Sequence, residues 1–256
     1  MRKLASVLLL NLAIISGLAN AVQGESAATA PDELTEVISG IENAANDQDI
    51  DELLEYYSDN FTNTDGLTTE TLANALIEIW DSYSQLQYTT EIESWSQEGD
   101  ELVAETITTI EGIQDTEERQ ASLNSTIKSR QYFQDQKLVR QEILLEQSQI
   151  NSGDNPPQVQ INAPTVVKAG AKYNFDLIVN EPLGERVLLG AVQEEKTAAN
   201  LYLNPTALEL EPLPAGGIYK VATAPLLTES NWISAILVRG DGITMVTHRI
   251  NIESKP

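Results

Sequence analysis

Three alternating carboxylates between residues 47 and 51 are the side chains in this sequence that most suggest metal chemistry. Asp47, Asp49 and Asp51 have the spacing of the first ligands of an EF-hand calcium loop. That loop requires Gly at its sixth position and Glu at its twelfth, where this chain has Glu52 and Ser58. Because both of these positions fail to match, the three carboxylates are better explained by helix capping, and no metal site is predicted.

Other candidate chemistry is sparse. The only histidine, His248, has no nucleophile or metal-ligand set around it in the sequence, so it is interpreted as structural. The sequence Arg239-Gly240-Asp241 matches an adhesion tripeptide. However, Gly-Asp-Gly over residues 240–242 is also typical of a hairpin turn. No residue is predicted to be catalytic, and no cofactor is predicted.

Charge divides the chain unevenly. Between Leu4 and Glu118 there is no Lys, Arg or His, while 25 Asp and Glu side chains fall in that stretch. Residues 22–154 carry a net charge of −24 and residues 155–256 a net charge of −2. A field of this sign repels phosphate backbones and anionic lipid, which excludes nucleic acid as a partner.

The N-terminus has the composition of a bacterial-type secretion signal. Met1-Arg2-Lys3 precedes an apolar run, and Ala19-Asn20-Ala21 offers small residues at a cleavage site. We expect a signal peptide over residues 1–21, a flexible leader over 22–31, and a periplasmic or extracellular protein with no membrane contact after cleavage. Cysteine is absent, so disulfides cannot support the fold.

The elements that must position any site follow from hydrophobic periodicity. Apolar residues repeat at three and four over residues 34–45, 49–57 and 72–83, which predicts three helices. After Ser84 the period changes to two, which predicts four strands over residues 86–95, 102–110, 123–127 and 138–147. Residues 32–150 should therefore form an α+β domain with helices on one face of an antiparallel sheet.

The remaining residues are predicted to form a second domain. Residues 151–157 (NSGDNPP) have the composition of a linker, and short alternating runs with intervening Gly and Pro follow. These runs predict an all-β sandwich over residues 158–254, with no helix and with a hairpin turn at residues 239–242. Two loosely joined modules should unfold in two separate transitions.

The first domain resembles the nuclear transport factor 2-like superfamily, also called SnoaL-like or ketosteroid-isomerase-like. The resemblance rests on residues 44–61 (AANDQDIDELLEYYSDNF) and on the order of three helices followed by a sheet. It implies a cone-shaped fold with a pocket between helices and sheet, and it allows a homodimer through the N-terminal domain. Residues 158–254 resemble, more loosely, a bacterial immunoglobulin-like domain through residues 164–175 (PTVVKAGAKYNF).

The implied pocket should be lined by hydroxyl groups and hydrocarbon. The inward face of the predicted sheet includes Ser94 and carries no carboxylate or imidazole, whereas Glu105 and Arg130 fall on the opposite face as cross-strand charge pairs. The candidate pocket-lining residues are Trp80, Tyr83, Tyr88, Thr90, Thr106, Thr108 and Ser125. For the aromatic members, ordinary core packing is the favoured interpretation, and an aromatic lining for an apolar or sugar ligand is the alternative.

These observations favour an exported, non-catalytic binding or interaction protein. Its partner would be a small apolar or sugar-like ligand or another protein. A rival hypothesis is an enzyme of ketosteroid-isomerase or SnoaL type, which would need a buried carboxylate within reach of Tyr83 or Tyr88. A third is an acidic surface protein that binds divalent cations weakly.

Overall fold

A computed structural model describes residues 24–115, 120–182, 184, 187–213 and 216–255. The predicted signal peptide, residues 1–21, lies outside these described residues. None of the helices in these ranges has the length and hydrophobicity that a bilayer-spanning helix needs.

The three helices predicted from periodicity are present. They are α1 (Asp32–Asp47), α2 (Ile50–Glu55) and α3 (Thr69–Ser82). Asp49 caps α2 by accepting a hydrogen bond from the backbone N–H of Glu52 at 2.9 Å, which confirms the capping role inferred for this carboxylate. Thr68 and Thr71 form a reciprocal capping box that starts α3.

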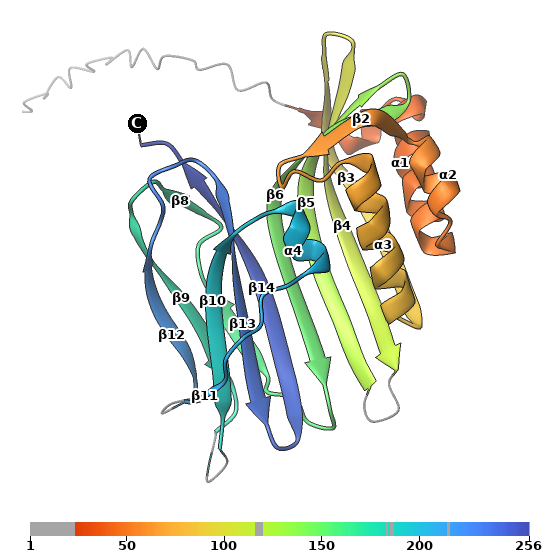
Figure 1. Cartoon of the computed structure of the whole chain (residues 1–256). Helices are drawn as coiled ribbons and strands as arrows, with labels where there is room; N and C mark the ends of the chain where they lie inside the picture. The colour runs from red at the N-terminus through yellow and green to blue at the C-terminus, as the bar shows by residue number, and fades with distance from the viewer. Residues whose placement is uncertain (1–23, 116–119, 183, 185–186, 214–215, 256) are drawn as a thin grey trace, which may run out of the picture.

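Most of the chain is β-strand, and one large sheet runs through the whole molecule (Figure 1). Its main path has the order β1-β3-β4-β5-β6-β14-β13-β10-β11, and β2 and β8 pair with β6 and β14 beside that path. The bounds of these strands are β1 Glu25–Ser26, β2 Tyr57–Asn63, β3 Gln85–Glu98, β4 Glu101–Asp115, β5 Gln120–Gln134, β6 Lys137–Ser152, β8 Val166–Lys168, β10 Leu189–Lys196, β11 Glu211–Pro212, β13 Ser230–Arg239 and β14 Gly242–Glu253.

The predicted fold class, a three-helix cone followed by a separate immunoglobulin-like sandwich, is wrong. Strand β6 continues to Ser152, through the first two residues of the predicted linker, and pairs with β14 from Ile243 to His248. The two halves therefore share one mainly antiparallel sheet. Alternation along a sequence predicts that a strand forms, but it does not specify a neighbour that lies about a hundred residues away.

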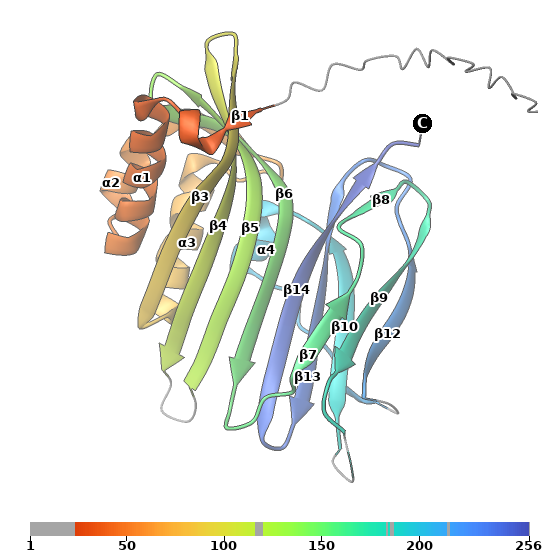
Figure 2. The same cartoon turned by 180° about the vertical axis from the view of Figure 1, so that it is seen from behind.

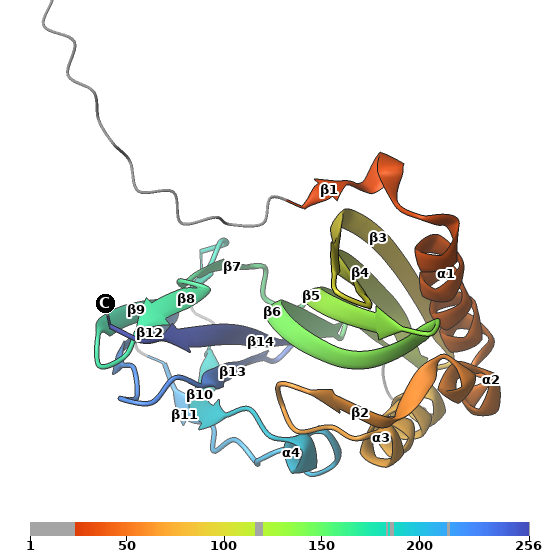
Figure 3. The same ribbon diagram turned by 90° about the horizontal axis from the view of Figure 1, so that it is seen from above.

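A smaller sheet covers only one end of the large one. It has the order β12-β9-β7 and consists of β7 (Val159–Asn162), β9 (Lys172–Val179) and β12 (Gly217–Thr223). Figure 2 shows it stacked on the β10-β13-β14 end, and Figure 3 shows α3 and α4 on the opposite side of the large sheet. Of the two hydrophobic cores, one lies between the sheets and the other lies under α1, α2 and α3.

Two segments have structure that the sequence did not predict. The expected leader contains β1, which pairs with Ser94 and Trp95 of β3, and a 3-10 turn over Ala27–Thr29. Beyond the predicted linker, where no helix was expected, α4 (Ala199–Leu203) forms a single short helix. Five residues are too few for a helical period to be recognised in a sequence.

A buried ionic cluster joins the two halves across the centre of the molecule. Arg249 of β14 is fully buried and donates bidentate hydrogen bonds to Asp65, at 2.8 and 2.5 Å, from the turn between β2 and α3. Glu146 of β6 accepts from the same guanidinium at 2.8 Å and from Trp232 Nε1 at 2.8 Å. Tyr202 of α4 donates its hydroxyl to Asp65 at 2.7 Å, so strands, turn and short helix converge on one cation.

Candidate functional site

The residues predicted to line a pocket are brought together, but their polar groups bond to one another. Thr90 and Thr108 hydroxyls lie 3.1 Å apart across β3 and β4. Thr106 is paired with Ser129 at 3.2 Å, and Ser125 with Ser148 at 2.7 Å. These hydroxyls of this face of the sheet therefore bond to one another in cross-strand pairs.

The aromatic candidates also pack internally. Trp80 donates from Nε1 to the Tyr88 hydroxyl at 3.1 Å, and both side chains are buried in the helical core. Burial raises the pKa of Tyr88, although the hydrogen bond from Trp80 opposes the rise. Tyr83 ends α3 and lies against Gly112, where an added Cβ would come within 2.9 Å of its ring. Over the described residues, no Asp or Glu side chain bonds to either tyrosine hydroxyl.

A β-bulge in β3 opens a cavity on the face away from the helices. Ile92 pairs with Thr106, but Ser94 pairs with Glu105, so Glu93 is an extra residue. The bulge reverses the alternation of the strand. Ser94, predicted to point inward, instead faces outward, and Trp95 takes the inward position in the helical core.

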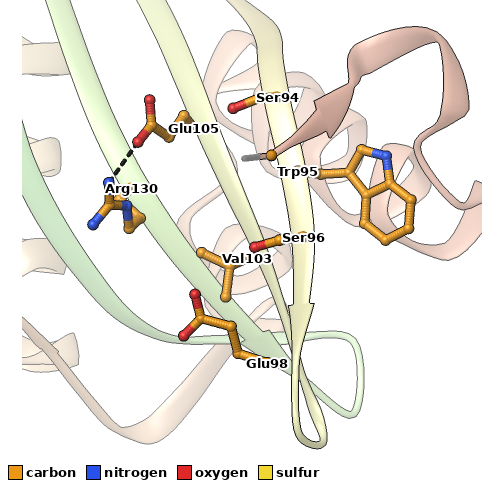
Figure 4. Close-up of a pocket in the computed structure, with 8 residues that line it drawn as sticks. Ser94, Trp95, Ser96, Glu98, Val103, Glu105 and Arg130 are labelled. Atoms are coloured by element: carbon orange, nitrogen blue, oxygen red, sulfur yellow. Dashed lines mark hydrogen bonds and ion pairs between the residues drawn. The ribbon is translucent and has the colours of Figure 1, made fainter. Parts of the chain in front are cut away.

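The cavity on this outer face has a volume of about 290 Å³, and we name it the open-face cavity. Figure 4 shows its side chains projecting from three adjacent strands, with the Trp95 ring turned away. It is lined by Gly24, Ser94, Trp95, Ser96, Glu98, Val103, Glu105 and Arg130. An added Cβ on Gly24 would lie 3.0 Å from the Ser94 side chain, so the segment before β1 forms a close wall.

Several polar groups around this cavity are unused. The hydroxyls of Ser94 and Ser96 and the carboxylate of Glu98 have no hydrogen-bonding or ionic partner in the part of the chain that the structure describes. The floor is Val103, whose side chain is buried. The arrangement offers hydroxyl donors and carboxylate acceptors around an apolar base, which suits a small polar molecule.

The remaining charged residues of the cavity belong to a cross-strand network. Arg130 donates to Glu105 at 2.6 Å, and Lys128 lies 3.3 Å from Glu105 and 2.6 Å from Glu93. The hydrogen bond from Arg130, with that from Lys128, lowers the pKa of Glu105, and the same bond raises the pKa of Arg130. The predicted charge pair of Glu105 and Arg130 on this face is confirmed. Glu105 and Arg130 are both held in their charged forms.

Most of the cavity was missed because its position depends on the bulge. Ser96 and Glu98 lie at the end of β3, beyond the residues predicted as strand. The available signal was Trp95, a large apolar residue at a position that strict alternation would have placed in solvent. A bulge just before it would have resolved that conflict and turned the serines outward.

No metal centre accompanies the cavity. Among the described residues there is no group of three or more His, Cys, Asp or Glu side chains arranged to hold a metal ion. His248 is buried against the backbone carbonyl of Pro164, 3.0 Å from its Nε2. Arg239 of the adhesion-like tripeptide has a side chain only 1% exposed and is paired with Asp241 and Glu181.

Comparison with known proteins places only part of the chain. Residues 154–253 match the model of a family described as a domain of unknown function (DUF8623). That match begins within the predicted linker and covers less than half of the chain. A search among curated proteins gives no significant match.

Matching solved structures include proteins described as SnoaL-like or as having a ketosteroid isomerase-like fold, and their structural similarity to this chain is low. A SnoaL-like polyketide cyclase from Agrobacterium tumefaciens is 16% identical with a TM-score of 0.32, covering 43% of this chain and 88% of that one. An LEH-like epoxide hydrolase from M. tuberculosis is 13% identical with a TM-score of 0.32, covering 43% and 80%. Bd1075 from Bdellovibrio bacteriovorus is 17% identical with a TM-score of 0.32, and the match spans 43% of this chain but only 38% of that protein. Similarity this low supports no inference about activity.

Proposed function

We propose that this protein is an exported, non-catalytic binding protein that takes a small, sugar-like ligand in the open-face cavity. The observation that carries the proposal is the set of unpaired groups on Ser94, Ser96 and Glu98 around a volume of about 290 Å³. That volume lies near the lower end of the ~300–1,000 Å³ usual for small-molecule sites. Polar lining favours a ligand with several hydroxyls over an apolar one.

Sugar hydroxyls both donate and accept, so they match this lining. Glu98 can accept two hydrogen bonds from neighbouring hydroxyls of a ligand, and Ser94 and Ser96 can each donate one and accept another. Arg130 keeps N–H donors beyond the one that it gives to Glu105. The strongly acidic half of the chain disfavours phosphorylated or carboxylated ligands.

Binding is better supported than turnover. General acid–base catalysis works best with a group whose pKa lies near the operating pH. In the open-face cavity, the hydrogen bond between Arg130 and Glu105 lowers the pKa of Glu105 and raises that of Arg130, so both move away from neutrality. These two groups act as fixed charges that orient a ligand.

The binding proposal is tested by titrating the mature protein with a panel of neutral mono- and disaccharides, following backbone amide signals by NMR. We expect shifts at residues 94–98 and 103–105, and at least a tenfold loss of affinity in the double variant Ser94→Val, Ser96→Val, about 1.4 kcal/mol. Thr109→Val on the same face of β4, outside the cavity, is the matched control. Saccharides that fail to shift these residues, or that bind the double variant equally well, would refute the proposal.

Export is tested independently. The apolar run before Ala21 supports cleavage there, which would leave Val22 and Gln23 ahead of Gly24, a wall of the cavity. We expect intact-mass measurement of protein recovered outside the cytoplasm of a bacterial host to give a chain beginning at Val22. Recovery of the full-length chain in the cytoplasm alone would contradict export without bearing on the cavity.

A further inference from the structure

A second cavity lies on the other face of the large sheet, where the two halves of the molecule meet. Its volume is about 150 Å³, and we name it the junction groove. Strands β6, β14, β13 and β10 form its floor, and the segment between α4 and β11 crosses above it with Pro205, Thr206 and Leu208. Figure 1 shows this segment passing in front of the sheet. The groove exists only because β6 and β14 pair.

The floor of the groove is a row of hydroxyls. Ser148 of β6 pairs in register with Thr247 of β14, which pairs with Ser234 of β13. The hydroxyls of Ser234 and Thr247 lie 3.3 Å apart, and that of Ser148 bonds to Ser125. Each hydroxyl can make a further hydrogen bond, so the floor can accept from a ligand donor.

The walls are largely apolar. Ile150 and Met245 pair across β6 and β14 at one end, and Leu208 closes the groove from above. Met245 is 40% exposed, which is unusual for a flexible apolar side chain with an adjacent cavity to fill. The walls therefore suit the hydrocarbon part of a ligand.

One carboxylate at the side of the groove has no counter-ion. Glu195 of β10 accepts from the Thr206 hydroxyl at 2.7 Å and from Gln193 at 3.3 Å. No Lys, Arg or His side chain of the described residues forms an ion pair with it. Its neighbour Glu194, by contrast, lies 3.5 Å from Lys220. A partly buried, uncompensated carboxylate beside hydrocarbon attracts a cation more strongly than a solvated one does.

From this geometry we propose that the junction groove binds a small alkylammonium compound. The ammonium group lies against Glu195 and the hydroxyl floor, and the alkyl part packs against Ile150, Leu208 and Met245. The volume admits only a small molecule, and the net charge of −24 enriches cations and repels fatty-acid anions near the surface. This site is separate from the open-face cavity on the opposite face of the sheet.

The test uses the mature protein and three probes of equal chain length: n-butylammonium, 1-butanol and butyrate. We expect n-butylammonium to bind with millimolar affinity and to shift the amide signals of Ser148 and Thr247. Its affinity should be at least about tenfold higher than that of 1-butanol. Butyrate should not bind. Equal binding of n-butylammonium and 1-butanol would show an apolar groove without cation recognition and would overturn the proposal.

Four variants test whether n-butylammonium binds in the junction groove. Glu195→Gln should weaken n-butylammonium binding by at least about tenfold, whereas Glu209→Gln, an exposed carboxylate on the same crossing segment, should leave it unchanged. Leu208→Trp should fill the groove and abolish binding without lowering Tm, which keeps the test decisive if Glu195→Gln folds poorly. Unchanged binding in Leu208→Trp would exclude this groove. The variant Ser94→Val, Ser96→Val should bind n-butylammonium normally, so failure at one site is distinguishable from failure at the other.

Discussion

At the scale of single residues, Arg249 is the centre of the buried ionic cluster that joins the two halves of the chain. Burial alone would raise the pKa of Asp65, but the hydrogen bonds and charge of Arg249 outweigh it and bring that pKa below its usual value. Arg249 stays charged because Asp65 and Glu146 overcome its own desolvation. Asp65 and Arg249 therefore depend on each other for their charged states.

Removing the cation should be costly. Arg249→Met leaves Asp65 and Glu146 buried without a counter-ion, and we expect a loss of about 3–5 kcal/mol in the free energy of unfolding, measured by urea denaturation. The matched control is Lys168→Met, whose partner Glu253 is solvent-exposed like itself, and which should cost less than about 1 kcal/mol. Equal losses in the two variants would mean that the buried cluster contributes no more than a surface pair.

His248 should make the folding stability depend on pH in a range where the carboxylates with lowered pKa values do not titrate. Burial lowers its pKa, against a hydrogen bond to Pro164, and its Nδ1 has no partner in the described structure. The folded state therefore resists protonation, so stability is complete above the unfolded pKa of about 6.5 and falls as pH drops below it. The lowered pKa values of Asp65 and Glu105 act only below the carboxylate range, about pH 4.

We expect the midpoint of urea unfolding to decrease between about pH 7 and pH 5 in the natural protein. His248→Gln keeps a donor toward Pro164 and has no titrating group, so its midpoint should stay nearly constant over that interval. Because His248 is the only histidine, a slope that persists in the variant would show that burial of this imidazole is not its cause.

At the scale of elements, the turn between β13 and β14 packs closely against the backbone of the segment at Pro156. Gly240 has open space around its Cα, whereas a Cβ on Gly242 would lie 2.4 Å from the Cα of Pro156. We expect Gly242→Ala to lose about 1–3 kcal/mol by overpacking, and Gly240→Ala to change stability by less than about 0.5 kcal/mol. Thermal denaturation of the two variants tests this, and equal stability would mean that the segment at Pro156 can move aside.

Elements with a clear local signal were predictable, and their partners were not. Helical spacing located α1, α2 and α3, capping by Asp49 marked the start of α2, and Gly-Asp-Gly located the turn between β13 and β14. Strand β2 was missed because its residues do not alternate cleanly, and its parallel pairing with β6 is long-range. Asp65 and Arg249 are 184 positions apart, so no sequence pattern connects them.

The same limit explains the candidate sites. Thr90, Thr108 and Ser125 lie on one face of the sheet, but whether a hydroxyl is free or paired depends on cross-strand register. The open-face cavity needed the bulge at Glu93, and the junction groove needed the pairing of β6 with β14. Both sites are therefore products of tertiary structure.

At the scale of the whole molecule, the large sheet is covered on opposite faces at its two ends. Helices α1, α2 and α3 cover the β3–β6 end, and the small sheet covers the other face at the β10-β13-β14 end. Strands β6 and β14 lie where the covering changes side, and there the Arg249 cluster joins them. Each core is formed by side chains from one half of the chain, and the halves are joined by the pairing of β6 with β14 and by the Arg249 cluster.

This continuity changes the expected unfolding behaviour from two transitions to one. Separating the halves would expose the paired edges of β6 and β14 and would leave Asp65 without Arg249, so an opened state should be high in free energy. We expect a single calorimetric transition whose van't Hoff and calorimetric enthalpies agree. Because the acidic half repels itself, sodium chloride should raise the Tm of that single transition, by about 2–4 °C for each kcal/mol gained. A fragment ending at Ser152 should not show a cooperative transition of its own. Two resolved transitions in the mature chain, or a stably folded fragment, would mean that the shared sheet does not couple the halves.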